Sequence, residues 1–115
     1  MAPTTDLNAV PAVIGRYQAA HDRHDSSAAA SAFTTDATVS DDGSTYVGAE
    51  VILGWLDTAA SEFTYTRTLV GAEQEDDRTW IVHNHLAGDF PGGTVDLSYR
   101  FVLRDDLIER LDIAP

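Results

Sequence analysis

The sequence predicts an α+β domain, with helices in the first half of the chain and a curved antiparallel sheet in the second. Apolar residues of the first half recur every three or four positions, which is typical of amphipathic helices. From Glu62 onward apolar and polar residues alternate, which is typical of antiparallel strands. The 115 residues, of which 43% are hydrophobic, suffice for a single domain, 1–115, with one core. A sheet that wraps around helices leaves a cavity between them.

Two helices are expected at the start of the chain. The first spans Leu7 to His24, where Asp6 can cap the start and Pro11 falls in the first turn, a position that tolerates proline. Its apolar stripe consists of Val10, Val13, Ile14, Tyr17 and His21. This stripe predicts that one face of the helix packs against the rest of the protein. The second helix, Ser26 to Phe33, is short and rich in alanine.

A small hairpin and a third helix are expected next. Ala37 to Ser40 and Thr45 to Val47 flank a turn of two aspartates and a glycine, residues that favour tight turns. The third helix runs from Gly48 to about Ser61. Its apolar residues, at helical spacing, are Val51, Ile52, Trp55 and Leu56.

Four strands complete the predicted fold. One face of the first strand carries Phe63, Tyr65, Arg67 and Leu69. The second strand runs from Thr79 to Asp89 and ends at a turn of one proline and two glycines. The third alternates most regularly, with Val95, Leu97, Tyr99, Phe101 and Leu103 on one face and Asp96, Ser98 and Arg100 on the other. After a turn at Asp105 and Asp106, the last strand carries Leu107, Leu111 and Ile113.

The composition excludes several classes of function. With 19 acidic and 7 basic residues the formal net charge is −12, and such a field repels nucleic acid and anionic lipid surfaces. The chain has neither lysine nor cysteine, which excludes Schiff-base and thiol catalysis and thiolate metal sites. It has no secretory signal pattern and no apolar run long enough to span a bilayer. We therefore expect a cytoplasmic protein with no nucleic acid or membrane partner.

The run from Arg16 to Gly43, RYQAAHDRHDSSAAASAFTTDATVSDDG, together with Gly48, Ile52 and Trp55, resembles the opening of the ketosteroid isomerase and SnoaL-like polyketide cyclase group. This group belongs to the nuclear transport factor 2-like superfamily. The resemblance, which extends to the order of elements over nearly the whole chain, implies a cone-shaped fold with three helices on a strongly curved antiparallel or mixed sheet. It also implies a deep apolar pocket and a homodimer formed through the sheet.

The resemblance assigns chemical roles to two residues. In the ketosteroid isomerases a tyrosine of the first helix donates a hydrogen bond to the substrate carbonyl oxygen, and an aspartate beyond the next strand shuttles the proton. An ungapped match puts these roles at Tyr17 and Asp41. The chemistry needs a base near the carbon and a donor at the enolate oxygen. The family's second donor falls at Leu97, which cannot donate, and strand alternation turns the neighbouring Asp96 to the other face.

Several of these residues also have a simpler interpretation. Asp41 lies in a stretch that favours turns, where its carboxylate can bond the backbone, and Tyr17 can be a core aromatic. Asn84 interrupts an apolar strand face, so it is either a ligand's hydrogen-bond partner or a satisfied core amide. His83 and His85 have a spacing compatible with metal binding, but a solvated or dimer-facing pair is the favoured interpretation.

The other two histidines and the remaining motifs give no second site. His21 and His24 fall near the end of the first helix, where a positive charge is favoured and a structural role suffices. The sequence has no nucleophile triad, phosphate loop or nicotinamide fingerprint, so no cofactor and no metal are expected.

These patterns favour a cofactor-independent proton-transfer enzyme that acts on a small apolar carbonyl compound by isomerisation or aldol-type cyclisation. Asp41 would be the base and Tyr17 the oxyanion donor. The pocket lining is expected to include Trp55, Trp80, Asn84, Leu97 and Tyr99. A non-catalytic domain of the same fold, which binds an apolar ligand or another protein, is the alternative. Hydrolysis or dehydration by Asp41 or a histidine is a third, weaker interpretation.

Overall fold

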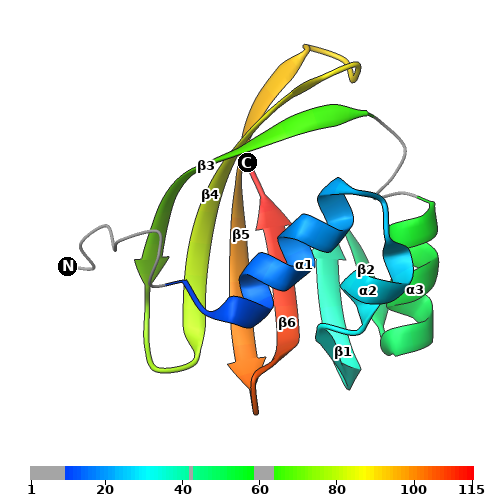
Figure 1. The fold of residues 1–115 in the computed structure, drawn as a ribbon, viewed down its shortest axis with the longest axis vertical. Coiled ribbons are helices and arrows are strands. Elements are labelled where there is room, and N and C mark those ends of the chain that lie inside the picture. The colour runs from blue at the N-terminus through cyan, green and yellow to red at the C-terminus, as the bar shows by residue number, and fades with distance from the viewer. Residues whose placement is uncertain (1–9, 42, 59–63) are drawn as a thin grey trace.

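The computed structural model describes residues 10–41, 43–58 and 64–115 and contains three helices and six strands in this part of the chain (Figure 1). In chain order the elements are α1 (Ala12–Asp22), α2 (Ser26–Ala30), β1 (Phe33–Asp41), β2 (Ser44–Val47), α3 (Ala49–Asp57), β3 (Tyr65–Gln74), β4 (Thr79–Gly88), β5 (Thr94–Arg104) and β6 (Leu107–Ala114). The predicted α+β class, with three helices on a curved sheet, is confirmed.

The six strands form one sheet in the order β2-β1-β6-β5-β4-β3. Neighbouring strands are antiparallel except β1 and β6, which run parallel and place Asp41 beside Ile113. The sheet is therefore mixed, and β6 lies in its interior, between β1 and β5. The β5–β6 turn falls at Asp105 and Asp106 as predicted, and their φ angles of 51° and 65° are the left-handed values that a tight two-residue hairpin requires.

The helices are shorter than the sequence pattern predicts. The first helical residue of α1 is Ala12 rather than Leu7, and Pro11 before it is extended, with φ −52° and ψ 142°. Proline disfavours helical angles in the residue that precedes it, so Val10 does not extend the helix. α2 ends at Ala30 because Phe33 already belongs to β1, and α3 ends at Asp57. The predicted positions Asp6, Ser61 and Phe63 lie outside the described residues.

The main core lies between α1 and the inner face of the sheet (Figure 1). Val13, Ile14 and Tyr17 of α1 are buried in it, together with Phe33 at the start of β1 and Phe101 of β5. The apolar stripe predicted for the first helix thus packs as expected. These side chains fill one end of the curved sheet, and the opposite end is hollow.

Candidate active site

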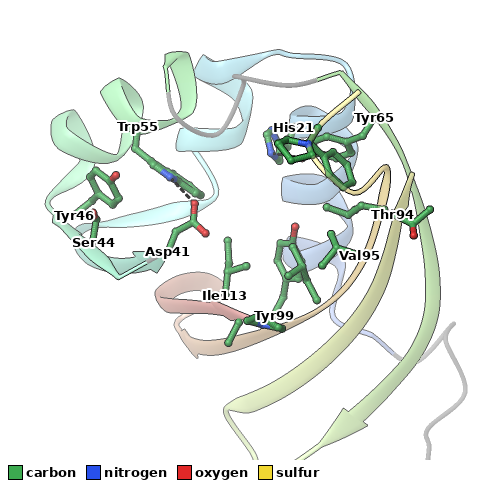
Figure 2. A pocket seen from close by; sticks show the side chains of 16 residues that line it. His21, Asp41, Ser44, Tyr46, Trp55, Tyr65, Thr94, Val95, Tyr99 and Ile113 are labelled. Carbon is green, nitrogen blue, oxygen red and sulfur yellow. Dashed lines mark hydrogen bonds between the residues drawn. The ribbon is translucent and has the colours of Figure 1, made fainter. Parts of the chain in front are cut away.

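A pocket of about 710 Å³ opens at this second end of the sheet (Figure 2). Its walls are β2, the ends of β1, β4 and β6, the first residues of β3 and β5, and the ends of α1 and α3. The lining residues are His21, Asp41, Ser44, Tyr46, Trp55, Tyr65, Leu86, Phe90, Pro91, Thr94, Val95, Leu97, Tyr99, Ile113, Ala114 and Pro115. Most of them are apolar or aromatic, so the few polar groups stand in mainly apolar surroundings.

Asp41 is the carboxylate in this wall. It ends β1, where it pairs with Ser44 of β2 and Ile113 of β6. The indole Nε1–H of Trp55, on α3, donates to Asp41 Oδ2 at 3.2 Å. Trp55 is itself buried, and its ring centroid lies 5.8 Å from that of Tyr46. The indole of a neighbouring helix therefore orients the Asp41 carboxylate. An aspartate that only stabilises a turn would not need such a partner.

Tyr17 lies behind the pocket wall and is not a lining residue. Its side chain is fully buried on α1, edge-on to Phe33 and Phe101 at centroid distances of 5.3 and 5.9 Å. Burial raises the pKa of Tyr17 well above its usual value, and the negative charge of Asp41 adds to this rise. The hydroxyl is thus protonated at neutral pH. Among the described residues it has no hydrogen-bond partner.

Leu97 and Tyr99 of β5 line the pocket, whereas two other predicted lining residues do not. Trp80 lies in the core opposite Phe101, at the far end of β4. Asn84 is fully buried, and its Oδ1 accepts a hydrogen bond from Arg67 Nη1 at 3.1 Å. Both share a strand face with Leu86, but Leu86, near the end of β4, is the residue of this strand that lines the pocket.

Arg67 joins α1 to β3 and β4 beneath the pocket. Its side chain is only 15% exposed. Its Nη2 and Nε donate to the carboxylate of Asp22 at 2.8 and 3.0 Å, and its Nη1 donates to Gln18 Oε1 at 3.2 Å as well as to Asn84. Asn84 is thus held as a core amide by one guanidinium, although its Nδ2 has no partner among the described residues.

The structure places His21 in the pocket wall, which the sequence pattern did not suggest. Its Nε2 lies 3.0 Å from the hydroxyl oxygen of Tyr65, the first residue of β3. Burial lowers the pKa of His21 below its usual 6.5 and raises the pKa of Tyr65 to about 12. Both groups are therefore uncharged at neutral pH. The signal in the sequence was the position of His21 on the apolar stripe of α1.

The outer face of the sheet holds His83 and His85 of β4. His83 Nε2 lies 2.6 Å from Glu73 Oε2, and His83 Nδ1 lies 3.0 Å from Ser98 Oγ. His85 Nδ1 lies 2.6 Å from Asp96 Oδ1. The Asp96 side chain is 81% exposed on this face, so it does not replace the donor missing at Leu97. No group of three or more His, Asp or Glu residues in the described ranges could hold a metal ion.

The burial of His21 predicts a loss of stability in mild acid. A histidine whose pKa is lower in the folded than in the unfolded protein binds fewer protons when folded. We expect the free energy of unfolding to fall as the pH drops through 6.5 toward the lowered pKa. Urea denaturation at pH 7.5 and 5.5 measures this fall, which should be smaller for His21→Gln. An equal fall in both proteins would show that His21 does not cause it.

A scan against protein-family models and a search of curated proteins gave no match. None of the described helices is long and apolar enough to cross a membrane. Among solved structures, a protein of Sinorhizobium meliloti named as a candidate polyketide cyclase is 29% identical, with a TM-score of 0.87. The similarity covers 96% of this chain and 100% of that protein.

Two more distant structures show the same fold. A Catenulispora acidiphila protein with a ketosteroid isomerase-like fold, in complex with trimethylamine, is 20% identical over 91% of this chain and 85% of its own, with a TM-score of 0.80. A Mycobacterium tuberculosis protein in complex with estradiol-17beta-hemisuccinate is 16% identical, with a TM-score of 0.75. The similarity covers 90% of this chain and 91% of that protein. In fold, the chain is thus similar to the candidate polyketide cyclase and to ketosteroid isomerase-like and nuclear transport factor 2-like proteins, as the resemblance in the sequence predicted.

Proposed function

We propose that this protein is a cofactor-independent proton-transfer enzyme, of the isomerase or polyketide cyclase type, that acts on a small apolar carbonyl compound. The observation that carries the proposal is the Asp41 carboxylate, which an indole N–H orients inside a largely apolar pocket of about 710 Å³. A half-buried carboxylate that is held in place in this way can accept a proton from a ligand bound in the pocket.

The chemistry assigned to Asp41 is the removal of a proton from the carbon next to the carbonyl group. The electron pair of the broken C–H bond moves onto the carbonyl oxygen and forms an enolate. In an isomerisation Asp41 returns the proton to another carbon of the substrate. In a cyclisation the enolate carbon instead forms a new C–C bond to a second carbonyl carbon, whose oxygen takes up the proton that Asp41 removed.

The enolate oxygen needs a proton donor, and we propose tyrosine for this role. Tyr99 lines the pocket, and burial raises its pKa above the usual value, so it keeps its hydroxyl proton. The hydroxyl of Tyr17 lies behind the wall, protonated and without a partner among the described residues. A buried donor without an acceptor is costly unless something pairs with it, so a ligand oxygen is a suitable acceptor.

Deuterium exchange tests the proposal directly. 2-Tetralone is an apolar ketone with an activated C–H bond beside the carbonyl. In D₂O the protein should speed the exchange of these hydrogens above the buffer rate, as followed by proton NMR. Exchange at the buffer rate, with 2-tetralone bound, would instead favour the non-catalytic binding domain.

Replacing Tyr17 with phenylalanine should separate its two interpretations. As an oxyanion donor, Tyr17 supplies stabilisation whose loss costs roughly a hundredfold or more in rate. Since its hydroxyl has no partner among the described residues, its removal should leave the melting temperature unchanged or higher. Exchange kinetics and thermal denaturation of Tyr17→Phe measure the two effects. An unchanged rate would leave Tyr17 as a core aromatic and Tyr99 as the donor.

The binding alternative has one specific observation in its favour. Leu97 stands in the pocket wall at the position where the family's second donor is expected, and it is apolar. Two proteins of the same fold hold small ligands, trimethylamine and estradiol-17beta-hemisuccinate. A pocket that lacks this second donor can bind an apolar carbonyl compound without stabilising its enolate strongly.

The homodimer through the sheet and the cytoplasmic location also stay predictions. The outer face that would form the dimer carries the paired groups of His83, Glu73 and Ser98 and of His85 and Asp96. Light scattering of the purified protein tests the dimer, and a mass of one chain would contradict it.

A further inference from the structure

The end of the pocket opposite Asp41 holds a second polar centre. Figure 2 shows Asp41 and Trp55 on one side of the pocket and His21 and Tyr65 on the other. The members of the second centre are 44 residues apart in the sequence and come from different elements, yet the Tyr65 hydroxyl lies 3.0 Å from His21 Nε2. Together they put polar groups into a wall that is otherwise largely apolar at this end.

Packing fixes the position of both rings. The ring of Tyr65 is edge-on to that of Phe90 at 6.4 Å and to that of His21 at 6.3 Å. His21 lies one helical turn beyond Tyr17, and their centroids are 6.1 Å apart. Because the rings of Tyr17 and Phe90 flank the pair, its polar atoms keep a constant place relative to a ligand.

The hydrogen bond between the two residues leaves Tyr65 with unused capacity. A phenol oxygen has one donor and two acceptor sites. If His21 carries its proton on Nδ1, Tyr65 donates to Nε2 and its oxygen can still accept. If the proton is on Nε2, the imidazole donates to Tyr65, and the Tyr65 O–H can point to a ligand. A ligand hydroxyl group both donates and accepts, so it fits either tautomer.

We propose that His21 and Tyr65 form a recognition site for a hydroxyl group on the substrate, separated by an apolar body from the carbonyl group that reacts near Asp41. This inference rests on the proposed function, since it assumes that the substrate's carbonyl end faces Asp41. The substrate class is then a hydroxylated apolar ketone, and Tyr65 selects it over the ketone without the hydroxyl group.

A matched ligand pair tests this specificity. 2-Tetralone and 6-hydroxy-2-tetralone differ by one hydroxyl group on the side of the ring system away from the ketone. Their affinities are measured by ligand-observed NMR or calorimetry on the full chain. We expect the hydroxyl compound to bind wild-type protein about fivefold to tenfold more tightly, the size of one net hydrogen bond. In Tyr65→Phe, which keeps the aromatic ring, the two affinities should be equal.

Tyr46→Phe is the matched comparison, because it removes a lining hydroxyl beside Trp55, at the Asp41 end of the pocket. It should leave the preference for 6-hydroxy-2-tetralone as it is in wild type. Equal affinities in wild-type protein, a preference that survives in Tyr65→Phe, or no binding of either compound would overturn the proposal.

The test distinguishes this proposal from the proposed function. 2-Tetralone lacks the second oxygen, so its deuterium exchange depends on Asp41 and not on the pair. Exchange without a hydroxyl preference would refute the recognition site alone. A hydroxyl preference without exchange would refute the enzyme and leave a selective binding pocket.

Discussion

Replacing Asp41 with asparagine should lower the exchange rate of 2-tetralone by about 10²- to 10⁴-fold, the usual contribution of a positioned general base. Asparagine has nearly the same size, and its carbonyl oxygen can still accept the Trp55 indole N–H that holds Asp41 at 3.2 Å. It cannot accept a proton at neutral pH. The change therefore removes the base while it keeps the pocket, and proton NMR in D₂O measures the loss.

Asp96→Asn is the control for this experiment. Asp96 is the acidic residue next to Leu97 in the sequence, but its side chain lies on the outer face of the sheet against His85. Its replacement should leave the exchange rate unchanged. A rate for Asp41→Asn equal to that of wild type would show that another group, or none, removes the proton.

Replacing Arg67 with methionine should lower the free energy of unfolding by about 3 kcal/mol or more, because loss of one partner leaves buried polar groups unpaired. The guanidinium is mostly buried and binds Asp22, Gln18 and Asn84 at once. Methionine fills most of the space and offers no donor. Urea denaturation at neutral pH gives the change in free energy.

Arg110→Met is the matched control, because Arg110 makes a comparable ion pair with Asp112 at 2.9 Å on the exposed face. Exposed pairs contribute about 0–1 kcal/mol, so this variant should unfold almost like wild type. If both variants lose a similar amount of unfolding free energy, the buried Arg67 contributes no more to stability than the exposed Arg110.

Sequence alternation predicted which face of each strand is buried, but not how far along the strand the pocket extends. Leu97 and Tyr99 of β5 line the pocket as expected, whereas Trp80 and Asn84 of β4 are buried deeper. The period of a strand tells one face from the other. Depth depends on how the other elements pack against the sheet, and no periodicity within β4 contains that information.

The sequence pattern also could not predict contacts between elements that are far apart in the chain. The indole of Trp55 meets Asp41, and the imidazole of His21 meets Tyr65, across gaps of 14 and 44 residues. Both contacts depend on how helices sit against strand ends. The position of His21 on an apolar stripe was visible in the sequence, but near a helix end a structural role explained it equally well.

The interior position of β6 has a consequence for the order in which the protein can form. β1 and β2 appear early during synthesis, yet β1 pairs on its other side only with β6, near residue 110. Until that segment leaves the ribosome, the two parts of the sheet have no strand to join them, and the core beneath α1 stays open. Such pairing between distant segments slows folding. The nascent chain therefore exposes Phe33, Val39 and their apolar neighbours until β6 has been made, and exposed apolar surface of this kind favours aggregation.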